Sequence, residues 1–356
     1  MSKKLTGKPI IIFGAGLIGR RALDYFGNDK VYCFADNFKH GQNFRGKPVI
    51  SFEKLVEIAS GYDIVAAMNI AAMREVFAQS TNASVKINDF HEYIDINNFK
   101  SNHEIVKFHN IHKGKRCFLI GNGPSLRIED LDKLYANGEI TFGCNFIYKI
   151  FPQTPWRPNY YVASDVAFLN YYTKEIADAE VEIKFIAEPK IVVLEKENTM
   201  KEILEAGKGY CYYYYYYKNF TFDYSGNNYF SDDPSKAIPC TGTVMYAMIQ
   251  LAVYMGFEKI YLIGVDATTS VYGCKDYDSE IRHFYNEPDL QIRKDIINLN
   301  PALTSITHDD VYLCMMYDFN CAEIYSRTHN FRIYNATRGG KLEVFERVDF
   351  DLLFNE

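Results

Sequence analysis

In the N-terminal part of the chain, short apolar runs alternate with stretches whose apolar residues recur every three or four positions. The runs predict strands, and the stretches between them predict helices through residue 26 and over 52–59 and 71–79. The predicted strands are 8–13, 30–35, 47–50, 63–68 and 84–88. Strands that alternate with helices form parallel sheets with right-handed crossovers. The pattern therefore predicts a Rossmann-like α/β domain over residues 1–93.

The alternation stops at residues 94–114, which are rich in Asn, His and Lys and are predicted to form a linker. It then resumes, with Gly256 in the position of a left-handed cap after one of the helices. The predicted helices are 128–134, the 170s, 243–255 and 311–328, and the predicted strands are 116–120, 140–144, 160–163, 184–187, 191–194, 259–264 and 331–335. We expect an α/β protein with two Rossmann-like parallel-sheet domains in tandem, the second over residues 115–356.

Two segments of the second domain do not follow either period. Six consecutive tyrosines, Tyr212–Tyr217, would alternate between the two faces of an extended strand. They would either line an acceptor cleft or fill a sheet, and their spacing does not separate these alternatives. Residues 267–307 are polar and irregular, which predicts a lid.

Composition and charge narrow the class of protein. The net charge of −6 argues against nucleic acid as a partner. No stretch approaches the about 18 apolar residues of a membrane-spanning helix. The lysines near the N-terminus precede a short apolar run that ends in a glycine turn, which predicts a strand and not a signal peptide. Eight cysteines without a CxxC pair predict reduced thiols and a cytoplasmic protein. Whether copies of the chain form a homo-oligomer stays open.

The first glycine motif, GAGLIG, follows the first predicted strand and opens a helix. It provides Gly14, Gly16 and Gly19, and Asp36 ends the next predicted strand. Such glycines allow a tight turn and close approach of a pyrophosphate, and the carboxylate reaches a ribose hydroxyl. The motif predicts an N-terminal nucleotide site, with a packing-only turn as the alternative.

The second glycine motif follows the strand at 116–120 and consists of Gly121, Asn122, Gly123, Pro124 and Ser125. Its glycines would let main-chain amides approach an anion, Pro124 would set the first turn of a helix, and Ser125 would present a hydroxyl and an amide at the helix start. Asn122 offers both a donor and an acceptor. The motif predicts that these amides hold a phosphoryl group.

Polar residues also end the neighbouring predicted strands. Asn145 follows one strand, Ser164 and Asp165 follow the next, and Asp266 ends the strand at 259–264. Thr241, Gly242 and Thr243 open the long helix. Each group alone has an ordinary reading as a cap or turn. Together they favour a ligand at the carboxyl edge of a parallel sheet.

Three segments of the second domain resemble a known superfamily: GNGPSL, GCNFIY and CTGTVMYAMIQLAVYMGFEKIYLIGVD. They resemble the bacterial sialyltransferases of glycosyltransferase family 42. They are still more similar to a related domain family found in motility-associated factors and in archaeal hydroxymethylpterin pyrophosphokinase-like (MptE-like) proteins. The resemblance covers roughly residues 115–350. The N-terminal part resembles small Rossmann-like domains from surface-polysaccharide gene clusters.

The resemblance implies an inverting glycosyltransferase that moves a sugar from a nucleotide donor, a CMP-sugar, to a surface-glycan or protein acceptor. The GNGPS turn and Asn145 would hold the nucleotide, and residues 239–243 would contact the sugar or phosphate. His308 best matches the position of the family's general base, and His283 in the predicted lid is the other candidate. The family's phosphate-binding tyrosines are not kept here, because Thr268 and Thr269 follow the GVD strand.

Three other functions stay open at this point. A pyrophosphokinase acting on a hydroxymethylpterin-like alcohol would need ATP and Mg²⁺, and the carboxylates of Asp165, Asp266, Asp276 and Asp278 would then matter, with Asp276 and Asp278 as candidate metal ligands. A glycosyltransferase of the implied type would require no cofactor or metal. The chain would otherwise be a non-catalytic nucleotide-binding module, or an oxidoreductase that uses GAGLIG. The turn at Arg338–Lys341 is a further candidate, as a clamp for a donor carboxylate or phosphate.

Overall fold

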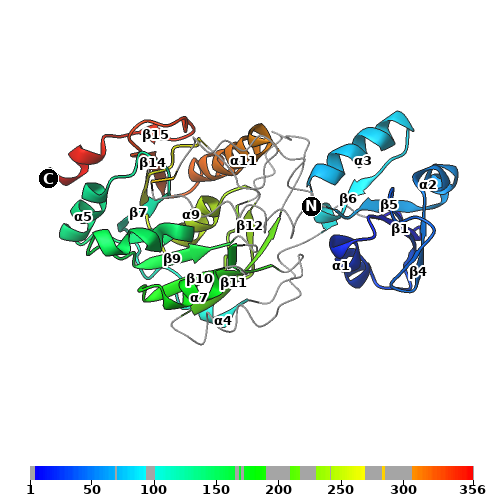
Figure 1. Ribbon diagram of the computed structural model, residues 1–356, viewed down its shortest axis with the longest axis horizontal. Helices are drawn as coiled ribbons and strands as arrows, with labels where there is room; N and C mark the ends of the chain where they lie inside the picture. Colours follow the sequence, from blue (N-terminus) through cyan, green and yellow to red (C-terminus); the bar gives the residue numbers. More distant parts are fainter. Residues whose placement is uncertain are drawn as a thin grey trace. The chain divides into compact units, whose positions relative to one another are not determined.

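The computed structural model describes most of the chain, and Figure 1 shows its helices and strands. It divides into two compact units, one consisting chiefly of Met1–Asn98 and the other of the chain from Phe99 onward. The described residues are 5–68, 70–93, 101–164, 168–169, 172–189, 209–216, 230–240, 242–268, 283–284 and 307–355. Among them, no helix is both long enough and apolar enough to span a bilayer.

The first unit is built on a six-stranded sheet with the order β3-β4-β2-β1-β5-β6. All its pairs are parallel except β3–β4. The strands are β1 (Ile10–Phe13), β2 (Val31–Ala35), β3 (Asn43–Phe44), β4 (Lys47–Ile50), β5 (Asp63–Ala66) and β6 (Asn88–Asp89). The helices are α1 (Leu17–Phe26), α2 (Phe52–Ile58) and α3 (Ile70–Asn82), with short 3₁₀ turns η1 (Ala59–Gly61) and η2 (Phe90–Tyr93).

The core of the first unit follows from the apolar runs. β1 and β5 are buried along their whole length, as central strands of a parallel sheet are. Ile11 and Phe13 face a cluster that includes Phe52 and Leu55 of α2 and Met73 of α3. The strand expected over 84–88 is wrong, because β6 begins only at Asn88. Ser84 has a φ of 57°, which breaks an extended chain at that point.

The second unit holds a nine-stranded sheet with the order β12-β11-β10-β9-β8-β7-β13-β14-β15. Every pair from β11 to β15 is parallel. The strands are β7 (Arg116–Ile120), β8 (Thr141–Cys144), β9 (Tyr160–Ala163), β10 (Ile183–Pro189), β11 (Gly209–Tyr216), β12 (Ile238–Cys240), β13 (Lys259–Ile263), β14 (Arg332–Asn335) and β15 (Glu346–Arg347). The helices are α4 (His103–Val106), α5 (Ile128–Ala136), α7 (Thr173–Asp178), α9 (Val244–Tyr254) and α11 (His308–Ser326), with 3₁₀ helices η4 (Asn145–Gln153) and η6 (Phe350–Phe354).

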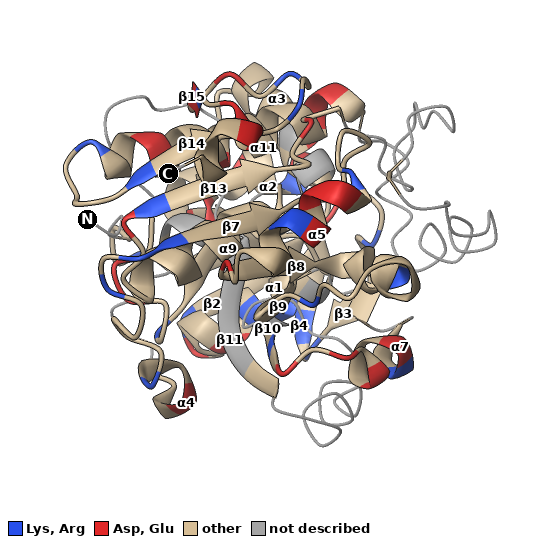
Figure 2. Ribbon diagram, turned by 90° about the vertical axis from the view of Figure 1, so that its left-hand side faces the viewer, with Lys and Arg blue, Asp and Glu red and all other residues tan. Residues whose placement is uncertain are grey.

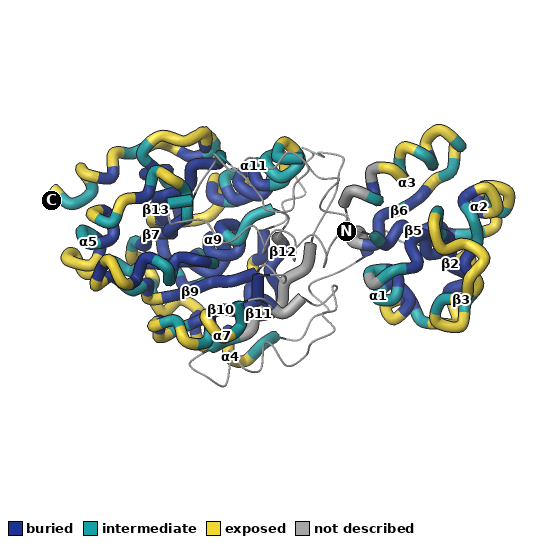
Figure 3. Tube along the Cα trace, in the orientation of Figure 1, coloured by how far each residue is buried: buried dark blue, intermediate teal, exposed yellow. Residues whose placement is uncertain are grey.

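This sheet lies between two apolar layers, and alternate residues of one strand face opposite layers. On β7, Cys117 and Leu119 pack with α9 and α11, whereas Phe118 and Ile120 pack with α5 and η4. Figure 3 shows the strands buried beneath helices whose outer faces are exposed. Figure 2 shows β7 and β13 free of charge except at their amino ends. These observations confirm the predicted α/β fold class with two parallel-dominated sheets.

The described part of the segment expected to be a linker, residues 101–114, packs onto the second unit. Ile105 and Phe108 are buried in the core beneath α9. The main-chain N–H of Asn110 donates to Tyr254 O (3.0 Å) and that of His112 to Met255 O (2.8 Å). This segment is therefore structurally part of the second unit.

Three basic side chains, one each from β7, α5 and the loop after β14, bind the last described turn, η6, to the centre of the second unit. Arg116 of β7 donates to Leu353 O (3.0 Å), and Lys133 of α5 pairs with Asp351 (3.3 Å). Arg338 pairs with both Asp351 (2.7 Å) and Asp130 of α5 (2.9 Å). The turn is thus tied to the central strand and to the helix that covers it.

Candidate functional site

The topology of the second sheet defines one ligand edge. From β7 the chain moves outward through β8, β9 and β10 to β11, and later returns to the other side of β7 with β13 and β14. The connections after β7 and β13 therefore diverge, and ligands of open parallel sheets bind at such a switch point, beyond the carboxyl ends of the strands. GNGPS follows β7 and GVD follows β13, so the fold brings these two motifs together.

The two motifs touch through their glycines. A Cβ on Gly121 would stand 2.4 Å from Gly264 O, and one on Gly123 would stand 2.7 Å from the same oxygen and 1.9 Å from Asp266 Oδ2. Gly264 itself has a φ of 64°, a conformation that glycine adopts without strain. The glycines are thus required by the close approach of two backbones.

The expectation that the turn's amides are available to a phosphoryl group needs correction. The N–H groups of Gly121 and Gly123 donate to Ile263 O and Gly264 O, each at 2.8 Å. The N–H and hydroxyl of Ser125 donate to Asp266 Oδ2 at 3.3 and 2.8 Å. An aspartate of the same chain therefore fills the place predicted for an anion. Burial raises the pKa of the Asp266 carboxyl, and its hydrogen bonds from Ser125 oppose that shift.

The expectation that Pro124 opens a helix is also wrong. Pro124 and Ser125 form a turn, Leu126 and Arg127 continue without helical structure, and α5 begins only at Ile128 with Arg127 as its N-cap. Ser125 is therefore not at a helix N-terminus. That Gly121, Asn122, Gly123, Pro124 and Ser125 contact a ligand stays a prediction.

Two asparagines at this edge hold buried acceptor atoms that lack partners. Asn122 Nδ2 donates to Cys144 O at 3.0 Å, which fixes the orientation of its amide and leaves Oδ1 buried without a hydrogen bond. Asn145, the first residue of η4, has a φ of 49°, and its Oδ1 is likewise buried and unsatisfied. Buried carbonyl oxygens without donors are rare, since each costs about 1–3 kcal/mol. The two residues follow the neighbouring strands β7 and β8.

The other strand ends place further predicted residues at this edge. Ser164 follows β9 and is buried, and Tyr161 of β9 donates its hydroxyl to Asn145 O at 2.8 Å. Tyr161 thereby supports the unusual backbone of Asn145. Asp165 lies outside the described residues.

Gly242, just before α9, packs against α11 and is not exposed to a ligand at this point. Gly242 N donates to Asp318 Oδ2 at 2.9 Å, and a Cβ on Gly242 would stand 2.8 Å from Cys314 Cβ and from Met315 N. The hydroxyl of Thr243 accepts from Met245 N and caps α9, which is its ordinary structural role. Thr241 lies outside the described residues.

The two candidate bases sit in different surroundings. His308 is the first residue of α11, directly after Thr307, whose side chain forms a capping box with Asp310. In a parallel sheet the helix that leads from β13 to β14 starts at the carboxyl edge, so His308 belongs to the candidate edge. His283 is half-buried, and this burial together with Lys149 lowers its pKa to about 4. It is therefore neutral at pH 7 but a weak base.

The remaining candidates from the sequence are a cationic turn at Arg338–Lys341 and the carboxylates of Asp276 and Asp278. The guanidinium of Arg338 pairs with Asp130 and Asp351, and a clamp for a donor anion in the turn at Arg338–Lys341 stays a prediction. Asp276 and Asp278 lie outside the described residues. Within the residues that are described, no three metal-ligating side chains gather.

The glycine turn of the first unit occupies its own switch point, between β1 and β5. Gly14 has a φ of 117°, and a Cβ there would stand 2.6 Å from Ala67 O; one on Gly19 would stand 1.8 Å from Gly14 O. A Cβ on Gly16, the N-cap of α1, would meet nothing within 4 Å. Asp36 Oδ2 accepts from Ala15 N at 2.9 Å, and its Oδ1 accepts from the N–H groups of Phe38 and Lys39. Whether this turn binds a nucleotide stays a prediction.

Sequence reasoning missed the partners that close the second turn. The sequence predicts Gly264 only as the end of a strand, and it does not predict the contact made by Gly340. A Cβ on Gly340 would stand 2.6 Å from Asp266 O, and Lys341 N donates to that oxygen at 2.7 Å. The signal available was the glycine placed directly before Val265 and Asp266, where a bulky strand residue would be expected.

The second unit is thus a doubly wound α/β domain with a polar switch-point edge. A family model described as 6-hydroxymethylpterin diphosphokinase MptE-like matches residues 93–271. That match spans half of the chain, and the chain belongs to the MptE-like family.

Comparison with solved structures finds the MAf glycosyltransferase from Magnetospirillum magneticum AMB-1, at 14% identity and a TM-score of 0.41. The similarity covers 97% of this chain but 58% of the other, so this chain spans little more than half of that protein. A search of curated proteins finds no match.

Proposed function

We propose that the chain is a glycosyltransferase that binds a CMP-sugar at the switch-point edge of its second unit and transfers the sugar, with inversion, to a glycan or protein acceptor. The observation that carries the proposal is the pair of buried, unsatisfied oxygens of Asn122 and Asn145. A nucleoside offers the donors that these oxygens lack.

The donor-rich part of the ligand is the part that this edge fits best. Ribose hydroxyls and the amino group of cytosine are donors, whereas phosphate oxygens at neutral pH are acceptors. Asp266 and the two asparagine oxygens are all acceptors, and the main-chain N–H groups of Gly121, Gly123 and Ser125 are already used. We therefore assign this edge to the nucleoside and not to the phosphate, which alters the role expected for the GNGPS turn.

The proposed general base is His308. A hydroxyl that attacks the anomeric carbon must lose its proton, and a neutral imidazole accepts it. His308 begins a helix at the ligand edge, whereas His283, with a pKa of about 4, has a weak proton affinity at pH 7. His283 is the alternative base in this proposal.

A second candidate function has support from the family itself. The description of the family model names a diphosphokinase, an activity that would require ATP with Mg²⁺. Asp266 lies at the ligand edge and would be one of the metal ligands. Metal dependence of nucleotide binding separates the two functions.

The experiment is a thermal-shift series with CMP, UMP, dCMP, CDP, GDP, ATP and NAD, each with and without Mg²⁺. We expect CMP to stabilise the protein without metal, by about 2.7 kcal/mol at a hundredfold excess over Kd. UMP lacks the amino donor and dCMP lacks one ribose hydroxyl, so both should stabilise less. Stabilisation by ATP that depends on Mg²⁺ would instead support the diphosphokinase.

Asn145→Gly is the matched variant for this series. Glycine accepts a φ of 49° without strain and removes the unsatisfied oxygen, so the ligand-free variant should be as stable as the wild type or up to about 1 kcal/mol more stable. The affinity of this variant for CMP should be at least tenfold lower than that of the wild type. Asn320→Ala, an exposed helical asparagine, is the control. An unchanged CMP response in Asn145→Gly would contradict the proposal.

A further inference from the structure

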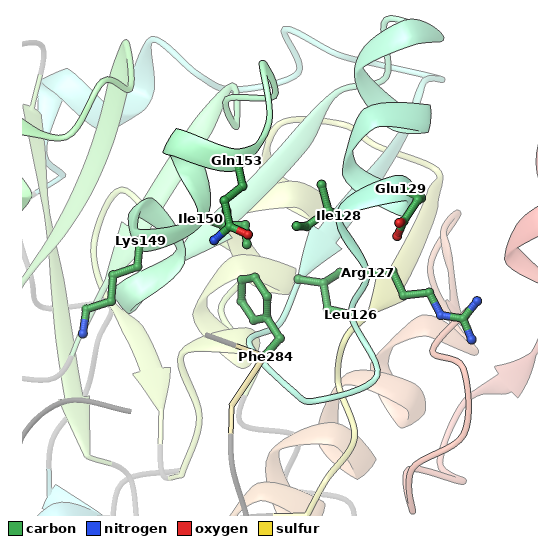
Figure 4. Close-up of a pocket in the computed structure, with 8 residues that line it drawn as sticks. All are labelled: Leu126, Arg127, Ile128, Glu129, Lys149, Ile150, Gln153 and Phe284. Carbon is green, nitrogen blue, oxygen red and sulfur yellow. The ribbon is translucent and has the colours of Figure 1, made fainter. Parts of the chain in front are cut away.

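A cavity lies beside the candidate edge, on the side of the sheet covered by α5 and η4. Its volume is about 470 Å³, within the range of small-molecule sites. Figure 4 shows the residues that line it: Leu126, Arg127, Ile128, Glu129, Lys149, Ile150, Gln153 and Phe284. None of them was predicted as a site residue from the sequence.

The cavity adjoins the GNGPS turn and η4, which hold the two asparagines. Leu126 of the cavity directly follows Ser125. Phe284 is hydrogen-bonded through its main-chain N–H to Asn122 O at 3.2 Å. A compound in the cavity would therefore lie next to a nucleotide at Asn122, as the second substrate of a transfer reaction must.

The lining combines an apolar centre with charged margins. The side chains of Ile128, Ile150 and Phe284 extend into the same space, together with the amide of Gln153 (Figure 4). The charged ends of Arg127 and Lys149 lie on opposite sides of this centre and point away from it (Figure 4). Apolar and aromatic walls with a few polar groups are typical of sites for small ring compounds.

The charge at the margin distinguishes among such compounds. Arg127 is exposed, and the described structure shows no ion pair or hydrogen bond to its guanidinium. Guanidinium groups bind carboxylates and phosphates with paired hydrogen bonds. Arg127 is therefore the group that can pair with an acidic substituent of a ligand, whereas Lys149 Nζ already lies 4.2 Å from the centre of the Phe146 ring.

We propose that this cavity is the acceptor site of the transferase and that it binds a saccharide with an acidic substituent. The ring lies against Phe284 and Ile150, Gln153 meets a hydroxyl, and Arg127 pairs with the acid group. This assignment depends on the proposed glycosyltransferase function.

The test is saturation-transfer NMR with methyl β-D-glucuronide and methyl β-D-glucoside, which differ in one carboxylate. We expect the full-length protein to bind the glucuronide about fivefold more tightly, the gain of one exposed ion pair. Arg127→Gln should abolish that preference. Arg327→Gln, which replaces the exposed arginine at the C-cap of α11, should keep it. Phe284→Ala should weaken the binding of both glycosides.

Three results would overturn the inference: no binding of either glycoside, equal binding of both, or a preference that survives in Arg127→Gln. CMP is measured on the same samples and reports on the proposed function separately. Protein that binds CMP but fails the glycoside test refutes the acceptor site alone. Protein that passes the glycoside test but binds no nucleotide refutes the glycosyltransferase and leaves a saccharide site.

Discussion

The two glycine turns of this protein have the same architecture but different chemistry. Each stands at the switch point of a parallel sheet, and each closes against the end of the neighbouring strand, Gly14 on Ala67 O and Gly121 on Gly264 O. In each, an aspartate accepts from a main-chain N–H of the turn. A glycine turn at a switch point is therefore not by itself evidence of an open phosphate site.

The difference lies in where the aspartate comes from and in what lies beside it. Asp36 directly follows β2, and α1 begins directly after the first turn. Asp266 follows the switch-point strand β13 itself, and α5 is delayed to Ile128. Only the second turn has the unsatisfied asparagine oxygens next to it in the described structure. The unsatisfied acceptors, more than the glycines, mark the candidate site.

The largest expected effect comes from filling the space within either turn. Gly19→Ala places a Cβ 1.8 Å from Gly14 O, and Gly123→Ala places one 2.7 Å from Gly264 O. Backbone must move in both cases, so we expect each variant to lose about 3 kcal/mol or more of unfolding free energy. Urea denaturation followed by circular dichroism measures the loss.

Gly16→Ala is the control within the same motif, since its Cβ meets nothing within 4 Å. It should lose no more than about 1 kcal/mol, the effect of alanine at an N-cap. Equal losses in Gly16→Ala and Gly19→Ala would show that the first turn is not packed as described.

The next effect is a pH dependence carried by the histidine beside the second turn. Because the pKa of His283 is about 4 in the folded protein and near 6.5 when exposed, the unfolded chain binds a proton that the folded protein does not. Stability contributed by neutral His283 is present above pH 6.5 and is lost as the pH falls towards 4, by about 3 kcal/mol.

Denaturation at pH 7, 5.5 and 4.5 compares the wild type with His283→Asn, whose stability should fall less steeply with acid. His40→Asn replaces an exposed histidine of the first unit and should follow the wild type. If the stability of all three proteins fell equally with acid, the lowered pKa of His283 would be refuted.

The smallest effect separates the two aspartates. Asp36 accepts three main-chain N–H groups on both of its oxygens, and an asparagine cannot accept on its amide nitrogen. Asp36→Asn should therefore lose about 1–2 kcal/mol. Asp266→Asn should lose less, because burial raises the pKa of Asp266 and a neutral amide avoids that burial cost.

Denaturation of both variants at pH 7 measures this contrast. A larger loss in Asp266→Asn than in Asp36→Asn would mean that the charge of Asp266 holds the second turn together. The turn would then resemble the first more closely than its hydrogen bonds indicate.

The sequence pattern correctly predicted the helices and strands whose signal lies within the element itself. β1, β2, β7 and β13 are continuous apolar runs, and α9 carries both its cap, Thr243, and its terminating Gly256. The pattern failed where local signals conflict. Residues 84–88 alternate like a strand but contain a left-handed serine, and η4 has an apolar period but contains Pro152.

The sequence predicted some residues of the candidate site but not the contacts between them. Asn122, Asn145 and Asp266 were found because they follow strands, and parallel topology brings strand ends to one edge. The pairing of Ser125 with Asp266, 141 residues apart, has no local signal. The cavity beside Phe284 was missed because its residues come from three separate segments and share no motif.

The fastening of η6 has a consequence for the order in which the chain acquires structure during synthesis. Arg116 bonds to Leu353, 237 residues later, and β7 pairs with β13 on the way. The first unit has all its strands within 89 residues and is free to fold while the ribosome is still at work. In the second sheet, the central strand β7 pairs with β13, which is synthesised much later. Contacts between residues so far apart in sequence favour slow folding. Nascent chains should therefore expose β7 to chaperones until β13 and η6 have left the ribosome.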